Sequence, residues 1–219
     1  TADAAHELRT PLAALKIHTQ VALLSEDPET RSHALKQLKA GVDRASHLVD
    51  QLLRLARLDP LAALPTTAPF DLGEATRETI AAVLESVNSL THDIDINIPE
   101  TPFIIEGDRD LIKIAIRNLV DNALRYTPHG GRISINIGMN DKNLSLSVID
   151  NGPGVTESEL SKLAERFYRG RENTVEGNGL GLAIVMRIAE LHGAQFTVAN
   201  AKPCGFIACL NWSPKQPNT

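Results

Sequence analysis

The sequence has 219 residues, of which 42% are hydrophobic and 22% are charged, and its formal net charge is -5 at pH 7. This length predicts two folded units, and the lack of a basic excess excludes a protein that chiefly binds nucleic acid or an anionic membrane surface. No run reaches the roughly 18 apolar residues of a membrane span, and neither a signal peptide nor an initiating Met is present, so we expect a soluble piece of a longer protein. The cysteines, Cys204 and Cys209, lack metal-ligand spacing and indicate a reducing compartment.

Residues 1–59 are predicted to form two helices. Asp27 is the expected N-cap of the second helix and Pro28 its first residue. Along that helix, apolar residues recur at intervals of three and four, as in a coiled coil or helical bundle. They are Leu35, Leu38, Val42, Ala45, Val49, Leu52 and Ala56. Two helices alone bury little surface, so we expect two copies of the chain to form a four-helix bundle.

The rest of the chain is predicted to form a second domain. Residues 60–71 contain three prolines and are interpreted as a linker, 72–213 as the domain, and 214–219 as a frayed tail. Hydrophobic periodicity predicts helices over 72–90, 110–126 and about 180–191. Alternation of apolar residues and turn signals predict strands over 93–99, 102–107, 131–138, 143–150, 194–201 and 205–212. This mixed order indicates an α+β protein with helices packed on a sheet.

The predicted helix over 110–126 has an apolar side and a polar side. The apolar side contains Ile112, Ala115, Leu119 and Ala123. Asn118, Asn122 and Arg125 share another face at i, i+4 and i+7. Asparagine is a poor helix former, and its amide oxygen is a suitable ligand for Mg²⁺, which takes the rest of its shell from waters and phosphates. Ordinary solvent exposure explains the same stripe and, for the stripe alone, is the commoner cause.

Two glycine-rich segments carry further candidate binding residues. "DNGPGV" (150–155) places Gly152 and Gly154 after the carboxylate of Asp150, which could accept a hydrogen bond from an exocyclic amine beside thin backbone. A simple turn explains the same residues. "GNGLGL" (177–182) precedes the last helix, where backbone N–H groups can bind phosphates, but it matches neither common nucleotide-binding glycine pattern.

The order of these segments resembles that of the bacterial sensor histidine kinases. "HELRTPL" resembles the H box of that family, "NLVDNALRYTP" the N box, "DNGPGV" the G1 box, "ERFYRG" the F box and "GNGLGL" the G2 box. The N-terminal helices are also similar to those of QseC-type sensors. The resemblance implies a fold in two parts: an N-terminal helical hairpin that forms a dimeric four-helix bundle, and an ATP-binding α/β sandwich of the Bergerat type.

The resemblance also implies roles for residues of the first domain. His6 matches the phosphoacceptor, Glu7 the neighbouring acid that assists it, and Thr10 the position used in the reverse, phosphatase reaction. We expect Glu7 to hold the second imidazole nitrogen and to stabilise the cation that forms. Pro11 removes a backbone donor from the turn that contains His6, so we expect a bend there that lets this turn shift between kinase and phosphatase geometries.

In the second domain the resemblance implies an ATP site. Asn118 and Asn122 match the Mg²⁺ and phosphate region, Arg125 stands where the family often has lysine, and Tyr126 lies beside the adenine. Asp150 matches the acceptor of the adenine amine, with Gly152 and Gly154 around the base. The phosphate-side loop is matched by Gly177, Gly179, Leu180 and Gly181. Arg169 either contacts a phosphate or is a solvated surface arginine.

These assignments together predict a homodimeric, ATP- and Mg²⁺-dependent protein histidine kinase. It would pass phosphate from His6 to an aspartate of a response regulator receiver domain and would catalyse the reverse phosphatase reaction. The resemblance implies the cytoplasmic portion of a bacterial inner-membrane protein, joined to the membrane only through a segment upstream of this sequence. The remaining histidines are assigned surface or cap roles.

Two other functions stay open on the sequence alone. The first is a gyrase-like or chaperone-like ATPase of the same nucleotide fold, although Asn118 stands where those families have a glutamate that activates water. The second is a silent scaffold that binds nucleotide and dimerises without catalysis.

Overall fold

The computed structural model describes residues 2–57, 67–86, 91–140, 143–165, 167–168 and 179–213. In the first two helices it describes the side chains of 11–43, 45–46, 48–49 and 52–53. The chain divides into two compact units, Thr1–Asp59 and Pro60–Thr219, and each is described by itself. Among the described helices, none combines the length and apolarity that crossing a membrane requires.

The first unit is a helical hairpin of α1 (Ala2–Leu24) and α2 (Pro28–Arg57). Asp27 caps α2 as predicted, because its carboxylate accepts hydrogen bonds from the backbone N–H groups of Glu29 (3.4 Å) and Thr30 (2.9 Å). α1 continues through Pro11 without a break in its helical assignment. His6, Glu7 and Thr10 lie in its first turns.

The apolar residues of α2 form two neighbouring stripes. One stripe is buried or half-buried in the hairpin and contains Ala34, Leu38, Gly41, Ala45, Leu48 and Leu52. The other, which we call the exposed stripe of α2, contains Leu35, Val42 and Val49, with side chains 51%, 46% and 40% exposed. The pattern predicted from the sequence therefore combines members of both stripes, and the Ala56 side chain lies outside the described residues.

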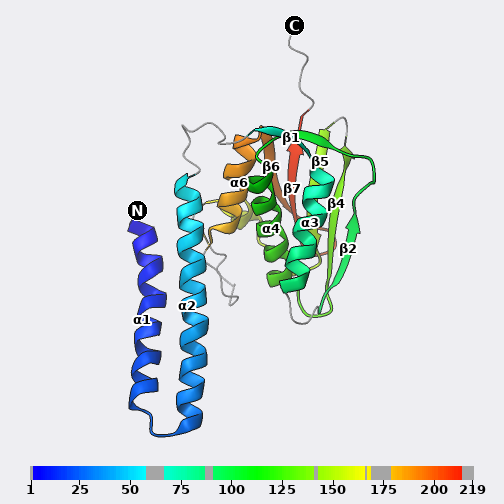
Figure 1. Ribbon diagram of the computed structural model, residues 1–219. Coiled ribbons are helices and arrows are strands. Elements are labelled where there is room, and N and C mark those ends of the chain that lie inside the picture. Colours follow the sequence, from blue (N-terminus) through cyan, green and yellow to red (C-terminus); the bar gives the residue numbers. More distant parts are fainter. Residues whose placement is uncertain are drawn as a thin grey trace. The chain divides into compact units, whose positions relative to one another are not determined.

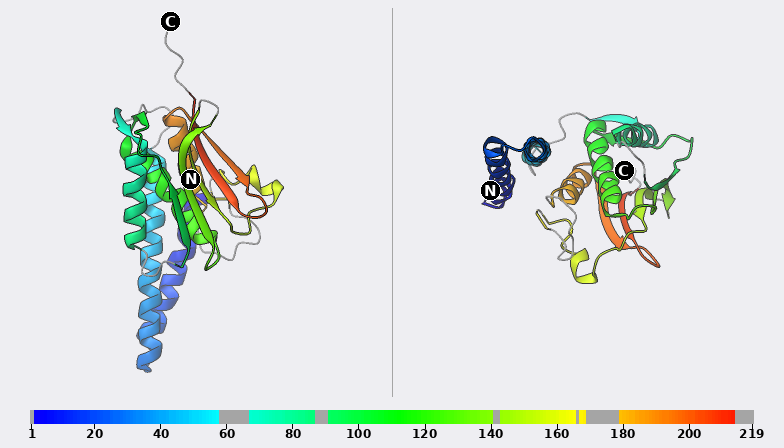
Figure 2. Two further views of the ribbon diagram at one scale, coloured as in Figure 1. Left: turned by 90° about the vertical axis from the view of Figure 1, so that its right-hand side faces the viewer. Right: turned by 90° about the horizontal axis from the view of Figure 1, so that it is seen from below.

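The second unit is a two-layer α/β sandwich. Its main sheet has five strands in the order β2-β4-β5-β7-β6, with β2 and β4 parallel and all other neighbours antiparallel. These strands are β2 (Asp93–Asn97), β4 (Arg132–Asn140), β5 (Asn143–Asp150), β6 (Ala194–Asn200) and β7 (Phe206–Trp212). The helices α3 (Leu72–Ser86), α4 (Arg109–Tyr126) and α6 (Gly181–Leu191) cover one face of this sheet (Figures 1 and 2). The predicted α+β sandwich is confirmed.

The core lies between the sheet and these helices. Alternate residues of β4 point into it, and Ile133 and Ile135 are fully buried. The apolar side predicted for α4 is buried as well, since Ile112, Ala115, Leu119 and Ala123 are at most 3% exposed. Burial of this face fixes which side of α4 turns away from the sheet, and that other side carries Asn118 and Asn122.

The structure corrects the predicted linker. Residues 68–71, placed in the linker on the basis of their prolines, form strand β1 (Ala68–Asp71), which pairs antiparallel with β3 (Ile104–Gly107). Proline is tolerated in an edge strand, because an N–H group that faces away from the sheet makes no hydrogen bond to a neighbouring strand. The second unit therefore includes β1, and residues 60–66 lie outside the described residues.

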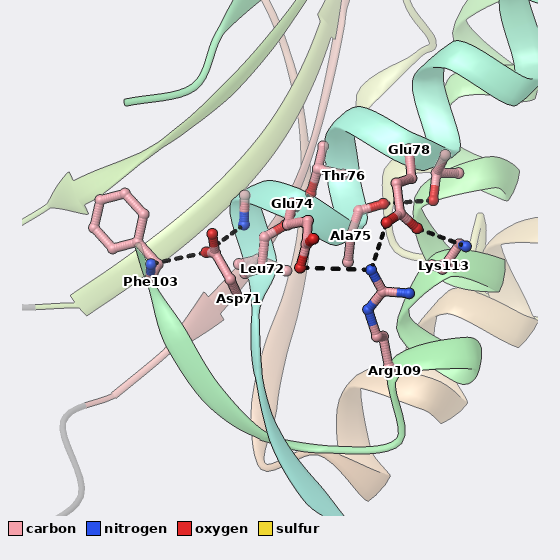
Figure 3. A network of polar contacts seen from close by, with 11 residues as sticks. Asp71, Leu72, Glu74, Ala75, Thr76, Glu78, Phe103, Arg109 and Lys113 are labelled. Atoms are coloured by element: carbon pink, nitrogen blue, oxygen red, sulfur yellow. Dashed lines mark hydrogen bonds and ion pairs between the residues drawn. The ribbon is translucent and has the colours of Figure 1, made fainter. Parts of the chain in front are cut away.

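Polar contacts hold the beginning of α3 against its neighbours (Figure 3). The Asp71 carboxylate accepts hydrogen bonds from the backbone N–H groups of Gly73 (3.0 Å) and Phe103 (2.9 Å). Farther along α3, Glu78 binds Arg109 (2.7 Å) and Lys113 (3.1 Å) of α4. The two helices are thus joined at the end where α4 begins. The structure also contains a short helix, α5 (Glu157–Leu160), that the sequence analysis did not predict.

Candidate functional site

Asp150 is a buried carboxylate at the end of β5. Its side chain is only 6% exposed, and it accepts a hydrogen bond from the Gly152 backbone N–H at 2.8 Å. Burial raises the pKa of Asp150 above its usual range, while hydrogen bonds from the backbone N–H groups of Gly152 and Phe206 oppose this rise. A buried carboxylate with remaining lone pairs is suited to accept an N–H donor from a ligand.

The backbone around Asp150 is packed too tightly for side chains. A Cβ atom at Gly152 would lie 2.7 Å from the Tyr126 carbonyl oxygen and 2.9 Å from the Asp150 carboxylate. Gly205, at φ +117°, passes so close to Asp150 that its Cβ would collide with the Asp150 carbonyl. The predicted grouping of Tyr126, Asp150 and Gly152 is therefore present: the end of α4 lies directly against the loop that follows β5.

Asn200 holds the next part of this loop. Its side-chain amide binds the backbone of Val155 twice, accepting from the N–H (2.9 Å) and donating to the carbonyl oxygen (2.7 Å). Gly154, at φ +71°, lies against the same amide, because its Cβ would come within 2.8 Å of the Asn200 oxygen. Gly154 thus allows the loop to adopt its left-handed backbone conformation close to Asn200, and the Asn200 amide keeps the loop in place.

Asn118 and Gly181 meet at another part of the same unit. The Asn118 amide nitrogen donates to the Ile114 carbonyl oxygen at 2.8 Å, which turns its oxygen toward the beginning of α6. A Cβ atom at Gly181 would lie 3.2 Å from that oxygen. The N-cap residue of α6 is Leu180, whose side chain is fully buried and apolar and so supplies no acceptor to the N–H groups of the first turn. This arrangement suits an anionic ligand at the start of α6.

Gly179 joins the G2 segment to the F-box segment. Its carbonyl oxygen accepts a hydrogen bond from the Phe167 N–H at 3.0 Å, and its Cβ would lie 2.6 Å from the Tyr168 carbonyl oxygen. Phe167 has φ 65° and Gly179 has φ 66°, so this crossing uses two left-handed residues, one of which is a bulky aromatic. The two ends of the segment that contains residues 169–178 therefore meet.

Of the remaining predicted site residues, only Asn122 and Arg125 have described side chains. Asn122 is half-buried on the same side of α4 as Asn118, and Arg125 is exposed in the last turn. Gly177 and Arg169 lie outside the described residues, as do the side chains of His6, Glu7 and Thr10. Among the described residues, no group of three or more His, Cys, Asp and Glu side chains could hold a metal ion.

Sequence reasoning missed three residues that shape the site, Asn200, Gly205 and Phe167, which position the loops around Asp150 and Gly179. Asn200 and Gly205 belong to no motif with a fixed spacing, and Phe167 lies in the F box, where only Arg169 was singled out. Gly205 follows a proline and a cysteine and resembles any turn glycine. Only the pairing of β5 with β7 reveals that it lies against Asp150.

Comparison with known families assigns both units. Residues 1–61 match the model described as the His Kinase A (phospho-acceptor) domain. Residues 107–216 match the model described as the histidine kinase-, DNA gyrase B-, and HSP90-like ATPase. With both matches in this order, the chain belongs to the sensor histidine kinases, and its second unit is an ATP-binding domain.

Among individual relatives, the chain is similar to Sensor protein QseC of Salmonella typhimurium. The two are 44% identical over 213 residues, which cover 97% of this chain and 46% of that protein. The Pseudomonas aeruginosa sensor protein kinase PmrB is 42% identical over 193 residues, covering 88% of this chain and 40% of that protein. The chain therefore spans about half the length of the curated relatives it matches.

Solved structures show the same fold. The cytoplasmic segment of histidine kinase QseC matches with a TM-score of 0.54 and 30% identity over 78% of this chain and 93% of that one. Histidine kinase ThkA in complex with response regulator protein TrrA matches with a TM-score of 0.78 over 99% of this chain and 61% of that one. Its identity is 24%, so that match concerns the fold alone.

Proposed function

We propose that this chain is the catalytic portion of a sensor kinase that transfers the γ-phosphate of ATP to His6 and then to an aspartate of a response regulator. The observation that carries the proposal is that the second unit contains two groups of residues suited to the two ends of a nucleotide, the base and the phosphates. Asp150, Gly152 and Tyr126 form one end, and Asn118 lies against Gly181 at the other. The first unit supplies the matching nucleophile in its His Kinase A segment.

We assign the Asp150 end to adenine. The ionised carboxylate of Asp150 can accept a hydrogen bond from the exocyclic amine, while the backbone N–H of Gly152 holds it in position. The absence of a Cβ at Gly152 keeps that carboxylate from being displaced. Tyr126, at the end of α4, would lie beside the base, and Gly154 would shape the loop around it. Recognition of the base thus depends on a rigid, buried acceptor.

We assign the Asn118 end to the phosphates. The first turn of α6, which begins at Gly181 directly after Gly179 and Leu180, would present backbone N–H groups to them, assisted by the positive end of the helix dipole. In the same proposal Gly177 and Arg169 would extend the phosphate-side loop, and Arg125 would add a positive charge at the edge of the site. These contacts place the phosphates without any covalent chemistry by this unit.

Mg²⁺ fits the residues at this end. The Asn118 oxygen is turned away from its own helix, since the amide nitrogen is engaged with Ile114, and Asn122 presents a second amide on the same side. Such oxygens are hard ligands, and a site with few protein ligands suits an ion that keeps waters and phosphate oxygens in its shell. When bound, Mg²⁺ would neutralise charge on the transferred phosphoryl group. We propose Asn118 and Asn122 as the residues that hold it.

The proposed reaction on His6 is an in-line displacement. An imidazole nitrogen forms a bond to the γ-phosphorus while the bond from that phosphorus to the bridging oxygen of ADP breaks, and ADP leaves with the electron pair. Glu7 would hold the proton on the second imidazole nitrogen and stabilise the positive charge that develops. The phosphohistidine would then donate its phosphoryl group to an aspartate carboxylate of the regulator. Thr10, one turn along the helix, would orient water for hydrolysis of that phosphoaspartate.

The partners follow from the same proposal. A receiver domain would approach the helical unit, and ThkA, which has a similar fold, was solved with a response regulator. We propose that a second copy of the chain covers the exposed stripe of α2, because its one leucine and two valines recur at heptad spacing, which is typical of a helical bundle. We place the chain on the cytoplasmic side of a bacterial inner membrane, in a longer sensor protein.

Labelled ATP tests the proposal directly. The wild-type chain should acquire an acid-labile, base-stable phosphoryl label, and His6→Gln should abolish this label while ATP binding to the second unit is retained. His18→Gln is the matched control, because His18 lies on the same helix α1 and has no proposed role. Label that persists in His6→Gln would contradict the assignment of the nucleophile.

The same experiment separates the two other functions. Release of inorganic phosphate without any labelled protein would favour the ATPase, and neither product in the presence of bound ATP would favour the scaffold. Thr10→Ala tests the reverse reaction separately. It should keep the label on His6 and slow the loss of phosphate from a phosphorylated regulator.

A further inference from the structure

We infer that His192 is a positioning residue for nucleotide binding, which sets the axial register of α6 against α4 and thereby places the phosphate end of the site. This inference rests on the proposed function, since it deepens the role of the same site. His192 lies at the end of α6, belongs to none of the five motifs, and is 8% exposed. The sequence analysis assigned it only a surface or cap role.

The His192 ring joins the last turn of α6 to Asp108, the N-cap residue of α4. Its Nδ1 lies 2.7 Å from the Ile188 carbonyl oxygen, which can only accept, so Nδ1 carries the proton. Nε2 of the neutral ring then accepts the backbone N–H of Asp108 at 3.0 Å, and the Asp108 carbonyl oxygen is farther away at 3.3 Å. One buried ring therefore satisfies polar backbone groups on two different elements.

Asp108 is the residue that starts α4. It is the N-cap, and its carboxylate accepts hydrogen bonds from the N–H groups of Asp110 (3.0 Å) and Leu111 (3.1 Å). The His192 imidazole fills the space beside Gly107, the residue before Asp108. A Cβ there would lie 2.2 Å from the ring Cδ2 and 2.7 Å from Nε2. The ring thus holds the N-cap in a fixed place relative to the end of α6.

The second contact between the two helices lies at the ligand end. There Asn118 of α4 faces Gly181 of α6, whereas His192 and Asp108 meet at the opposite end, so the helices run antiparallel. At about 1.5 Å per residue, the ten residues from Asp108 to Asn118 and the eleven from Gly181 to His192 each span roughly 15 to 17 Å. Because a helix is stiff along its axis, a shift at His192 moves Gly181 along Asn118 by a similar amount. The proposed adenine end is formed by Asp150, Gly152 and Tyr126, of which only Tyr126 belongs to one of these helices, α4. Because α6 contributes none of them, a shift of α6 along α4 should leave the adenine end in place.

Substitution of His192 should therefore change binding of the phosphates more than binding of the base. In the full chain, His192→Leu should weaken ATP binding about tenfold and leave adenosine binding within about twofold, as titrations with each compound would measure. His192→Gln retains an acceptor near the position of Nε2 and should lose less affinity for ATP. His129→Leu is the matched control, because His129 is exposed in the same unit and should affect neither compound.

Gly107→Ala tests the inference without altering His192. The added methyl group must push the ring from Asp108, so this variant should show the same selective loss of ATP affinity even if His192→Leu folds poorly. Faster hydrogen exchange of the Asp108 amide in both variants would report the lost contact. Equal losses for ATP and adenosine, or no loss for either, in Gly107→Ala and His192→Gln would overturn the inference. A wild-type chain that binds no ATP would instead overturn the proposed function.

Discussion

The helical hairpin and the sandwich unit differ in what they do with large apolar side chains. In the described part of the hairpin, α1 and α2 expose leucines, valines and an isoleucine along their length, and Leu23 and Leu24 are 77% and 82% exposed. In the sandwich, the apolar side chains of the helices and of the sheet are buried against each other, and Ile116, Leu146 and Ile184 are 0% exposed. The sandwich therefore buries its own apolar surface, whereas the hairpin leaves apolar side chains exposed, which fits the second copy that we propose to cover them.

The largest expected effect concerns assembly of the hairpin. Replacing both Val42 and Val49 by Asp puts charges into the exposed stripe of α2, where a partner would have to bury them unpaired, and should convert a dimer to a monomer. Light scattering would measure the mass, and ATP binding should remain. His33→Asp is the control, because His33 is exposed on the opposite side of α2, roughly two and a half turns from Val42. A double variant that stays dimeric would contradict the proposed interface.

The next effect concerns stability of the sandwich. Leu146→Ala leaves a cavity beneath the helices and should lower the free energy of unfolding of this unit by about 3 kcal/mol, measured by urea denaturation. The mass of the dimer should not change. Met139→Ala on the same sheet is 60% exposed and should cost little by comparison. If Leu146→Ala also dissociated the dimer, the two units would not be independent.

Asp150→Asn should separate binding from stability within the sandwich. Loss of the charged acceptor should weaken ATP binding by about 2 kcal/mol, roughly 30-fold. The apo protein should become more stable at neutral pH, because the raised pKa of Asp150 means that ionising this carboxyl costs stability in the folded state. Calorimetry would measure both, with exposed Asp95→Asn as the control. A less stable apo variant would contradict this account.

ATP affinity should also depend on pH through the same carboxyl. Burial raises the pKa of Asp150, so binding that needs the ionised form should be full above this raised pKa and fall as the pH drops through it. Over the interval between the usual and the raised value, the folded state holds more protons than the unfolded state, so unfolding becomes easier as the pH rises. Affinity titrations from neutral to acidic pH should show the decline in wild type and a flatter profile in Asp150→Asn.

The smallest effect is expected at the surface network of Figure 3. Glu78 binds Arg109 and Lys113, which hold the pKa of its carboxyl below the usual range. The resulting stability is complete above the usual pKa and disappears as the pH falls through the lowered one. Glu78→Gln should lower the melting temperature slightly at low salt and not at all at high salt, because these charges are exposed. Salt-independent destabilisation would indicate a packing role instead.

Much of the sandwich was predictable because its signals are local. The apolar side of α4 and the alternation along β4 and β5 each follow from residues close in sequence, and burial confirmed them. Strand β1 was missed because its proline is typical of a linker as well as of an edge strand. Likewise, the heptad pattern of α2 was visible, but it does not show which positions face α1 and which remain exposed.

The sequence by itself determined the class of this protein, since five ordered motifs identify a sensor histidine kinase and predict which residues carry its chemistry. Only the tertiary structure decided how these residues are held. Asn200, Gly205 and His192 act through partners about 45 to 84 positions away, across paired strands or antiparallel helices. No local pattern encodes such contacts, because the packing of distant elements creates them. The histidine without a motif thus joins the two helices on which the proposed phosphate site depends.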